Sequence, residues 1–226
     1  MREYNLLEGY PPPKFPRYVS NDLRKISNRI IAINRDKEFF DGDRNNGYGG
    51  FSYDGRWKNL ALKIIDEYNL NDGSNFLQIN SEKGFLLYDM HSLNSRINLF
   101  GLESSAYAKE NTLKEVYDNT KIGDYLNLDY PDNHFDFVLA IGVVYSFNLK
   151  DAIKSILEIQ RVTKKNSFLT LASYENEKDY FLFKKWTLLG NTILKKKEWR
   201  EVLDYCNFTG DYFFTNASSL HLKEKN

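Results

Sequence analysis

Cysteine is almost absent from this sequence of 226 residues, and its scarcity excludes two kinds of stabilising site. Cys206 is the single cysteine, so no disulfide forms within the chain and no cysteine-based metal cluster is available. The three histidines lack zinc-ligand spacing, and neither an HExxH nor a CxxC pattern occurs. We therefore expect no metal site, and we expect the chain to reside in the reducing cytoplasm.

An excess of charge of either sign is also lacking. The sequence has 31 Lys and Arg residues and 31 Asp and Glu residues, so no overall field attracts nucleic acid or an anionic membrane. The longest apolar runs, such as residues 135–144, are interrupted, here by Asp136 and Gly142, and the N-terminus lacks a secretion-signal pattern. The sequence predicts no nucleic-acid partner and no membrane partner.

An alternation of strand and helix patterns follows residue 57. Short apolar strands are expected at residues 75–79, 97–102, 135–141 and 167–172, with helices over 58–68, 84–93, 105–117, 150–162 and 198–206. Residues 210–215 and 219–222 have the pattern of two short strands suited to an antiparallel hairpin at a sheet edge. Strands that alternate with helices predict an α/β fold with a mostly parallel sheet.

The first 56 residues differ from the rest of the chain. Pro11, Pro12 and Pro13 favour extended backbone, and a helix is expected around residues 22–35. The glycines and aromatic residues of the segment 47–57 suit either a packed turn or a loop that covers a pocket, and we favour the loop. These features predict an N-terminal extension or lid.

The alternation is interrupted once, at residues 174–197, which are rich in charged and aromatic side chains. An insertion at this place is suited to capping the substrate side of the sheet. We therefore divide the chain into an extension or lid over residues 1–56 and an α/β domain over residues 57–226, with 174–197 as a cap insertion.

A strand runs directly into a loop and a helix at residues 76–87. In open α/β sheets this is where backbone N–H groups at the helix start face a nucleotide, and glycines let the chain approach it. Here Gly84 is the one glycine of the loop, and Glu103 lies nineteen residues beyond it. That spacing is close to the roughly twenty residues expected for a carboxylate that binds ribose hydroxyls.

Four segments together resemble class I S-adenosylmethionine-dependent methyltransferases, in particular small-molecule enzymes of bacterial surface-polysaccharide biosynthesis clusters. The resemblance covers about residues 47–222, and its carriers are the loop after Ile79, the stretch 100–104, the stretch 122–125 and the stretch 131–138. It implies a Rossmann-like fold: a mostly parallel seven-stranded sheet with helices on both faces and the antiparallel C-terminal hairpin.

The resemblance also implies S-adenosylmethionine as the cofactor and names residues that bind it. The four motif positions of the family loop, one acidic and three glycine, are held here by Gln78, Asn80, Glu82 and Gly84. The family aspartate that matches Asp124 accepts a hydrogen bond from the adenine amino group, and its neighbour, here Tyr125, lines the adenine slot. With Glu103 on the ribose, the expected cofactor-binding residues are Gln78, Asn80, Gly84, Glu103, Asp124 and Tyr125.

The substrate side carries less specific signals. Methyl transfer to oxygen or nitrogen requires alignment and, where the acceptor loses a proton, a base. Tyr145 stands near the place where many family members have a histidine, and it is the one catalytic candidate, although a wall of the pocket is the better reading because tyrosine is a poor base at neutral pH. Tyr53, Arg56 and Tyr145 are the expected substrate-binding residues.

Two hypotheses for function follow. The first, which we favour at this point, is a methyltransferase that acts on a small acceptor, sugar-like or phosphorylated; the strand order, Glu103, Asp124 and the aromatic lid favour it. The second is a pseudoenzyme, a methyltransferase-like subunit without catalysis that partners an active homologous methyltransferase; Gln78, Asn80, Glu82 and Tyr145 favour it. A homodimer and a different nucleotide-like ligand remain open, the latter because a fold does not fix a function.

Overall fold

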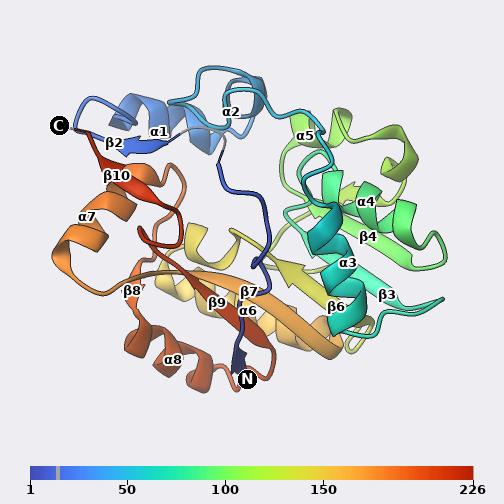
Figure 1. The fold of residues 1–226 in the computed structure, drawn as a ribbon. Coiled ribbons are helices and arrows are strands. Elements are labelled where there is room, and N and C mark those ends of the chain that lie inside the picture. The colour runs from blue at the N-terminus through green and yellow to red at the C-terminus, as the bar shows by residue number, and fades with distance from the viewer. Residues whose placement is uncertain (14–15, 226) are drawn as a thin grey trace.

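The computed structural model of the chain describes residues 1–13 and 16–225. Within these residues, the main sheet has eight strands, and every pairing in it is parallel (Figure 1). In spatial order the strands are β1 (Arg2–Glu3), β9 (Asp211–Thr215), β7 (Thr163–Tyr174), β6 (Phe135–Ala140), β3 (Asn75–Ile79), β4 (Asn98–Glu103) and β5 (Thr120–Ile122), and β8 (Leu194–Lys195) pairs with β7. The predicted α/β fold with a mostly parallel sheet is confirmed.

Helices cover both faces of the sheet because side chains alternate between the faces along each strand. Phe76 of β3 lies in one apolar cluster with α3 (Lys58–Glu67) and α4 (Phe85–Leu93). Leu77 and Ile79 lie in a second cluster with α6 (Leu149–Val162) and α8 (Lys196–Tyr205). The main core is therefore two apolar layers that sandwich the strands and fix where their carboxyl ends lie.

The prediction of an antiparallel C-terminal hairpin is wrong. β9 joins the sheet parallel to β7, and its other edge is taken by β1, so no edge is left on β9 for a returning strand. The turn at residues 216–221, held by hydrogen bonds between Asn216 and Ser219, leads the chain off the sheet. β10 (Leu222–Glu224) then pairs in parallel with β2 (Arg17–Val19) in a separate two-stranded sheet.

Short elements were the ones that the sequence pattern missed. The helix expected over residues 105–117 divides into α5 (Ala106–Glu110) and a 3-10 turn, Lys114–Val116, before β5. The proposed cap, residues 174–197, contains α7 (Glu177–Trp186), which begins at the capping side chain of Asn176. These elements are too short for a periodic pattern to distinguish them from loops.

The N-terminal region does not stand apart from the α/β core. Leu6 is fully buried in the cluster that contains α3 and α4. Two short helices, α1 (Ile26–Ile33) and α2 (Lys37–Asp41), follow it in the sequence. Figure 1 shows α1, α2 and the two-stranded sheet gathered at one end of the main sheet, with α8 and the N-terminus at the opposite end. None of the helices in the described part of the chain is both long and apolar enough to cross a membrane.

Candidate functional site

The candidate site lies where the order of the strands reverses. β3 pairs with β4 on one side and with β6 on the other, and the carboxyl ends of these three strands meet there. In open α/β sheets this crevice is where ligands bind. Asn80, the first residue after β3, spans it: its side-chain amide donates to the carbonyl oxygen of Ile141 beyond β6, at 3.4 Å.

The loop after β3 has an unusual backbone. Asn80, Glu82 and Gly84 all have left-handed φ angles, 64°, 53° and 74°. Gly84 is required for a second reason, since a Cβ there would lie 2.9 Å from the Thr112 side chain and 3.0 Å from that of Val116. Asparagine enters the left-handed region at modest cost, whereas glutamate does so at a cost of roughly 1 kcal/mol. The loop therefore keeps a glycine-type backbone with only one glycine.

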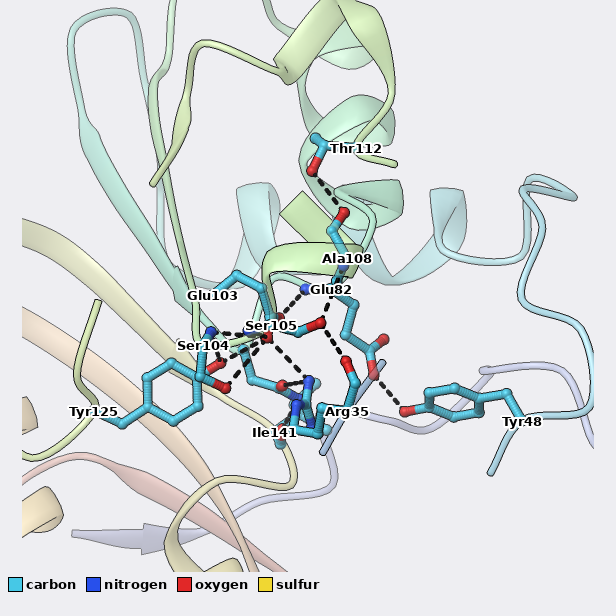
Figure 2. Close-up of polar contacts among 11 residues, drawn as sticks. Arg35, Tyr48, Glu82, Glu103, Ser104, Ser105, Ala108, Thr112, Tyr125 and Ile141 are labelled. Carbon is cyan, nitrogen blue, oxygen red and sulfur yellow. Dashed lines mark hydrogen bonds and ion pairs between the residues drawn. The ribbon is translucent and has the colours of Figure 1, made fainter. Parts of the chain in front are cut away.

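Glu103 is the most fully satisfied carboxylate of the site, as Figure 2 shows. Its side chain is 0% exposed. One oxygen accepts from the backbone N–H of Glu82 at 2.7 Å, and the other accepts from the backbone N–H groups of Ser104 and Ser105, each at 2.8 Å. The Tyr125 hydroxyl donates to that second oxygen at 3.2 Å. The carboxylate thus serves as an internal cap for the turn after β4.

Arg35 closes the crevice. One nitrogen of its guanidinium lies 2.6 Å from the side-chain oxygen of Asn80 and 3.1 Å from the carboxylate of Glu103 (Figure 2). The Ser105 hydroxyl donates to the backbone carbonyl of Arg35, so both ends of the residue are held. Arg35 therefore joins the carboxyl ends of β3 and β4 through its side chain.

The side chain of Glu82 contacts the segment of residues 35–51, which we call the covering segment. The Tyr48 hydroxyl of this segment donates to the Glu82 carboxylate (Figure 2). The next loop residue, Lys83, pairs with Asp41 of α2 at 2.7 Å and donates to the Phe51 carbonyl at 2.9 Å. Two consecutive loop residues thus tie the covering segment down.

Burial changes the acidity of Glu82. Loss of hydration raises the pKa of this carboxyl to about 7, against the lowering effects of the Tyr48 hydrogen bond and the Arg35 charge, and the Glu103 charge raises it further. Near neutral pH, Glu82 therefore takes up a proton far more readily than an exposed glutamate does.

We expect the stability of the chain to fall between about pH 4.5 and 7 because of Glu82. Its pKa is raised from 4.5 to about 7 in the folded state, so the stabilisation is fully present below pH 4.5 and is lost as the pH rises through 7. The difference is about 3 kcal/mol in the free energy of unfolding. Urea denaturation at pH 4 and pH 8 measures it in the wild type and in Glu82→Gln, with exposed Glu110→Gln as the control. Equal pH dependence of the wild type and Glu82→Gln would contradict the assignment.

The other expected cofactor residues lie in differing surroundings. Tyr125 is buried, and burial raises its pKa while its hydroxyl accepts from the Ser104 N–H at 2.9 Å. Asp124 is exposed, and its carboxylate accepts from the backbone N–H of Leu126 at 2.8 Å, which is the bond of an ordinary Asx turn. Gln78 is buried, and its side-chain oxygen has no hydrogen-bond partner among the described residues. The structure therefore brings Asn80, Glu103 and Tyr125 together but leaves Asp124 at the surface.

The expected substrate residues are engaged elsewhere. The Tyr53 hydroxyl donates to Asp89 of α4 at 2.5 Å. Arg56 makes a two-pronged contact with its neighbour Asp54, at 2.8 and 2.6 Å. Burial raises the pKa of Tyr145 to about 12, which makes this side chain an even weaker base than a free tyrosine. No group of three or more His, Cys, Asp or Glu residues in the described ranges is arranged to hold a metal ion.

Sequence reasoning missed Arg35, which now carries the central ion pair. The expected helix 22–35 placed it on a helix, whereas α1 ends at Ile33 and Arg35 has a left-handed φ of 49°. Asp41 was missed as well. No local pattern marks either residue, because their partners lie 42 to 68 positions further along the chain.

Residues 79–171, which run from the end of β3 into β7, match the model of the methyltransferase domain family. The chain has a methyltransferase fold. No curated protein sequence matches it significantly.

Solved structures with the methyltransferase fold resemble the chain over most of its length. A S-adenosyl-L-methionine-dependent methyltransferase described as putative, from Methanococcus maripaludis, has 20% identity over 68% of this chain and 77% of its own, with a TM-score of 0.51. PigF, solved with SAH, has 14% identity over 81% of this chain and 64% of its own, with a TM-score of 0.52. A protein described as a putative methyltransferase, in complex with the Haloferax volcanii Trm112 methyltransferase activator, has 18% identity over 69% of this chain and 77% of its own, with a TM-score of 0.50.

The residues of this methyltransferase fold do not fit S-adenosylmethionine in the conformation described. The resemblance assigns the ribose hydroxyls to Glu103, and this buried carboxylate already accepts from Ser104, Ser105 and Tyr125 on one oxygen, which Arg35 also contacts, and from the Glu82 N–H on the other. The family loop has glycine where Glu82 places a carboxyl group, and Gln78 replaces the acidic residue that precedes it. Side chains of the protein therefore contact the carboxylate to which the resemblance assigns the cofactor.

Proposed function

We propose that the chain is a methyltransferase-like subunit that does not use S-adenosylmethionine and that partners an active methyltransferase of the same fold. The observation that carries this proposal is the occupation of Glu103. An incoming ribose would have to displace the Arg35 guanidinium, which lies 3.1 Å from a fully buried carboxylate. Separating a buried pair costs roughly 3–5 kcal/mol when one charge is left without a partner.

The acidic loop supports the same proposal. S-adenosylmethionine carries a carboxylate on its methionine part, and Glu82 places a second carboxyl group in the corresponding loop. Lys83, the one cation of the loop, is already paired with Asp41. Charge repulsion and steric overlap therefore both oppose cofactor entry at pH values where Glu82 is ionised.

A partner role is supported by an exposed apolar stripe on α1. Ile26, Ile30 and Ile33 lie on one face of this helix and are 72%, 61% and 68% exposed. Ala32, on the opposite side, is buried with the rings of the covering segment. The Haloferax volcanii neighbour in its activator complex is a precedent for a methyltransferase fold that works with a second protein.

The second candidate is an active S-adenosylmethionine-dependent methyltransferase that acts on a small, sugar-like or phosphorylated acceptor, as in surface-polysaccharide synthesis. The left-handed backbone at Asn80, Glu82 and Gly84 favours it, since this backbone shape is what a cofactor loop needs. In this alternative the covering segment has to leave the crevice before the cofactor enters.

Calorimetry distinguishes the two candidates. We expect no saturable heat when the purified wild-type chain is titrated with S-adenosylmethionine or with its demethylated product at concentrations up to about 1 mM, a limit of roughly 4 kcal/mol in binding free energy. The same titration of the chain mixed with a homologous methyltransferase that copurifies with it should give binding. Micromolar binding by the isolated chain would overturn the proposal and favour the enzyme.

A further inference from the structure

A cluster of arginines surrounds the indole ring of Trp186, at the end of α7. The guanidinium carbon of Arg24 lies 3.8 Å from the ring centroid, that of Arg44 lies at 5.4 Å, and that of Arg17 lies at 5.8 Å. These arginines come from three separate places: β2, the turn before α1 and the loop after α2. Nothing local in the sequence brings them together, so their convergence is a property of the fold.

Within residues 1–13 and 16–225, no acidic side chain pairs with this cluster. Among the described residues, the acceptors of Arg17, Arg24 and Arg44 are all backbone carbonyls, and none of these arginines takes part in an ion pair. Arg24 and Arg44 donate to the same carbonyl oxygen, that of Gly47. The Nε of Arg17 is buried and has no acceptor in the described part of the chain.

Like charges held this close are unfavourable unless an anion compensates them. Burial lowers the pKa of Arg24 to about 9, and the charges of Arg44 and Arg17 contribute to that shift. Burial likewise lowers the pKa of Arg17 and of Arg44. The face of the Trp186 ring attracts these cations and offsets part of their repulsion. The three guanidinium groups still lack a compensating anion among the described residues.

We propose that Arg17, Arg24, Arg44 and Trp186 form a binding site for a phosphorylated small molecule, with a diphosphate group as the matched ligand. Guanidinium groups have planar forks of N–H donors that fit phosphate oxygens in pairs, and several converging forks suit a ligand with two phosphates. An extended nucleic acid is a poor fit, because the chain has no net charge to hold a long phosphate backbone.

The site borders the crevice described above. Gly47, whose carbonyl is shared by Arg24 and Arg44, directly precedes Tyr48, which donates to Glu82. A ligand held by the arginines would therefore lie against the covering segment. The inference does not depend on cofactor binding, so it remains valid for either proposed function.

Titration with inorganic pyrophosphate tests this site. We expect saturable heat in calorimetry for the wild type, a loss of about tenfold in affinity for Arg24→Gln and for Arg44→Gln, and a larger loss for the double variant. Arg96→Gln is the matched control, since Arg96 is exposed and pairs with Asp72. Citrate, an anion without phosphate, should bind more weakly than pyrophosphate.

Trp186 provides a second readout that reports on position. Pyrophosphate should change the tryptophan fluorescence of the wild type and of Arg96→Gln, and the change should be absent in Trp186→Phe. Circular dichroism of each variant establishes that it folds. No saturable binding by the wild type, equal affinity in Arg24→Gln, Arg44→Gln and Arg96→Gln, or a fluorescence change that persists in Trp186→Phe would each overturn the proposal.

Discussion

Replacing Glu103 by Ala should destabilise the chain by about 4 kcal/mol, the largest effect that we expect from a single substitution at the site. The substitution removes the acceptor of three backbone N–H groups, those of Glu82, Ser104 and Ser105, in a place with no access to water. It also leaves the Arg35 guanidinium without its counter-charge. Urea denaturation at pH 7 measures the difference in the free energy of unfolding.

A double-mutant cycle separates the two contributions to that loss. Arg35→Ala combined with Glu103→Ala should be less destabilised than the sum of the single variants, since the unpaired guanidinium is then gone. Exposed Glu201→Ala is the control and should change stability by less than about 0.5 kcal/mol. A loss of under about 1 kcal/mol for Glu103→Ala would mean that the carboxylate is not the internal cap described here.

Restoring an empty crevice should restore cofactor binding, and this is the second large effect. We expect the triple variant Arg35→Ala, Asn80→Gly, Glu82→Gly to bind S-adenosylmethionine at least about a hundredfold more tightly than the wild type, which corresponds to about 3 kcal/mol. Three changes contribute to this gain: the variant removes the guanidinium from the Glu103 carboxylate, removes the acidic side chain of Glu82, and relieves the left-handed strain at residues 80 and 82.

The double variant Asn80→Gly, Glu82→Gly, which retains Arg35, is the matched control for this gain. It should recover only part of the affinity, because the guanidinium still occupies the Glu103 carboxylate. Calorimetry of both variants and of the wild type gives the comparison. If the folded triple variant binds no better than the wild type, then Arg35, Asn80 and Glu82 are not what excludes the cofactor.

The α/β fold could be predicted from the sequence because it depends on strong, local patterns. Residues 75–79 and 135–140 are short apolar runs between turn signals, and the structure places a strand at each. The hairpin could not be predicted in the same way. Residues 211–215 have the pattern of a strand, but the pattern does not show which strands pair with them. In the structure, β1 at the N-terminus pairs with the outer edge of β9, so a returning strand has no edge to join.

At the site, the sequence located the loop and Glu103 because the loop follows one strand, β3, and Glu103 lies at the end of the next, β4. The roles of these residues were harder to foresee. The partner of Glu103 is Arg35, which the helical pattern assigned to α1 and which reaches the carboxylate only because the chain turns left-handed after Ile33. Contacts between segments this far apart depend on the complete fold.

The left-handed residues at positions 80, 82 and 84 show that a loop can keep its backbone shape without the glycines that usually form it. A search for glycine spacing passes over this turn, whereas a search of torsion angles retrieves it at once. Other chains that have asparagine or acidic residues where this loop usually has glycine should therefore be sought by their backbone torsion angles and not by their glycine spacing.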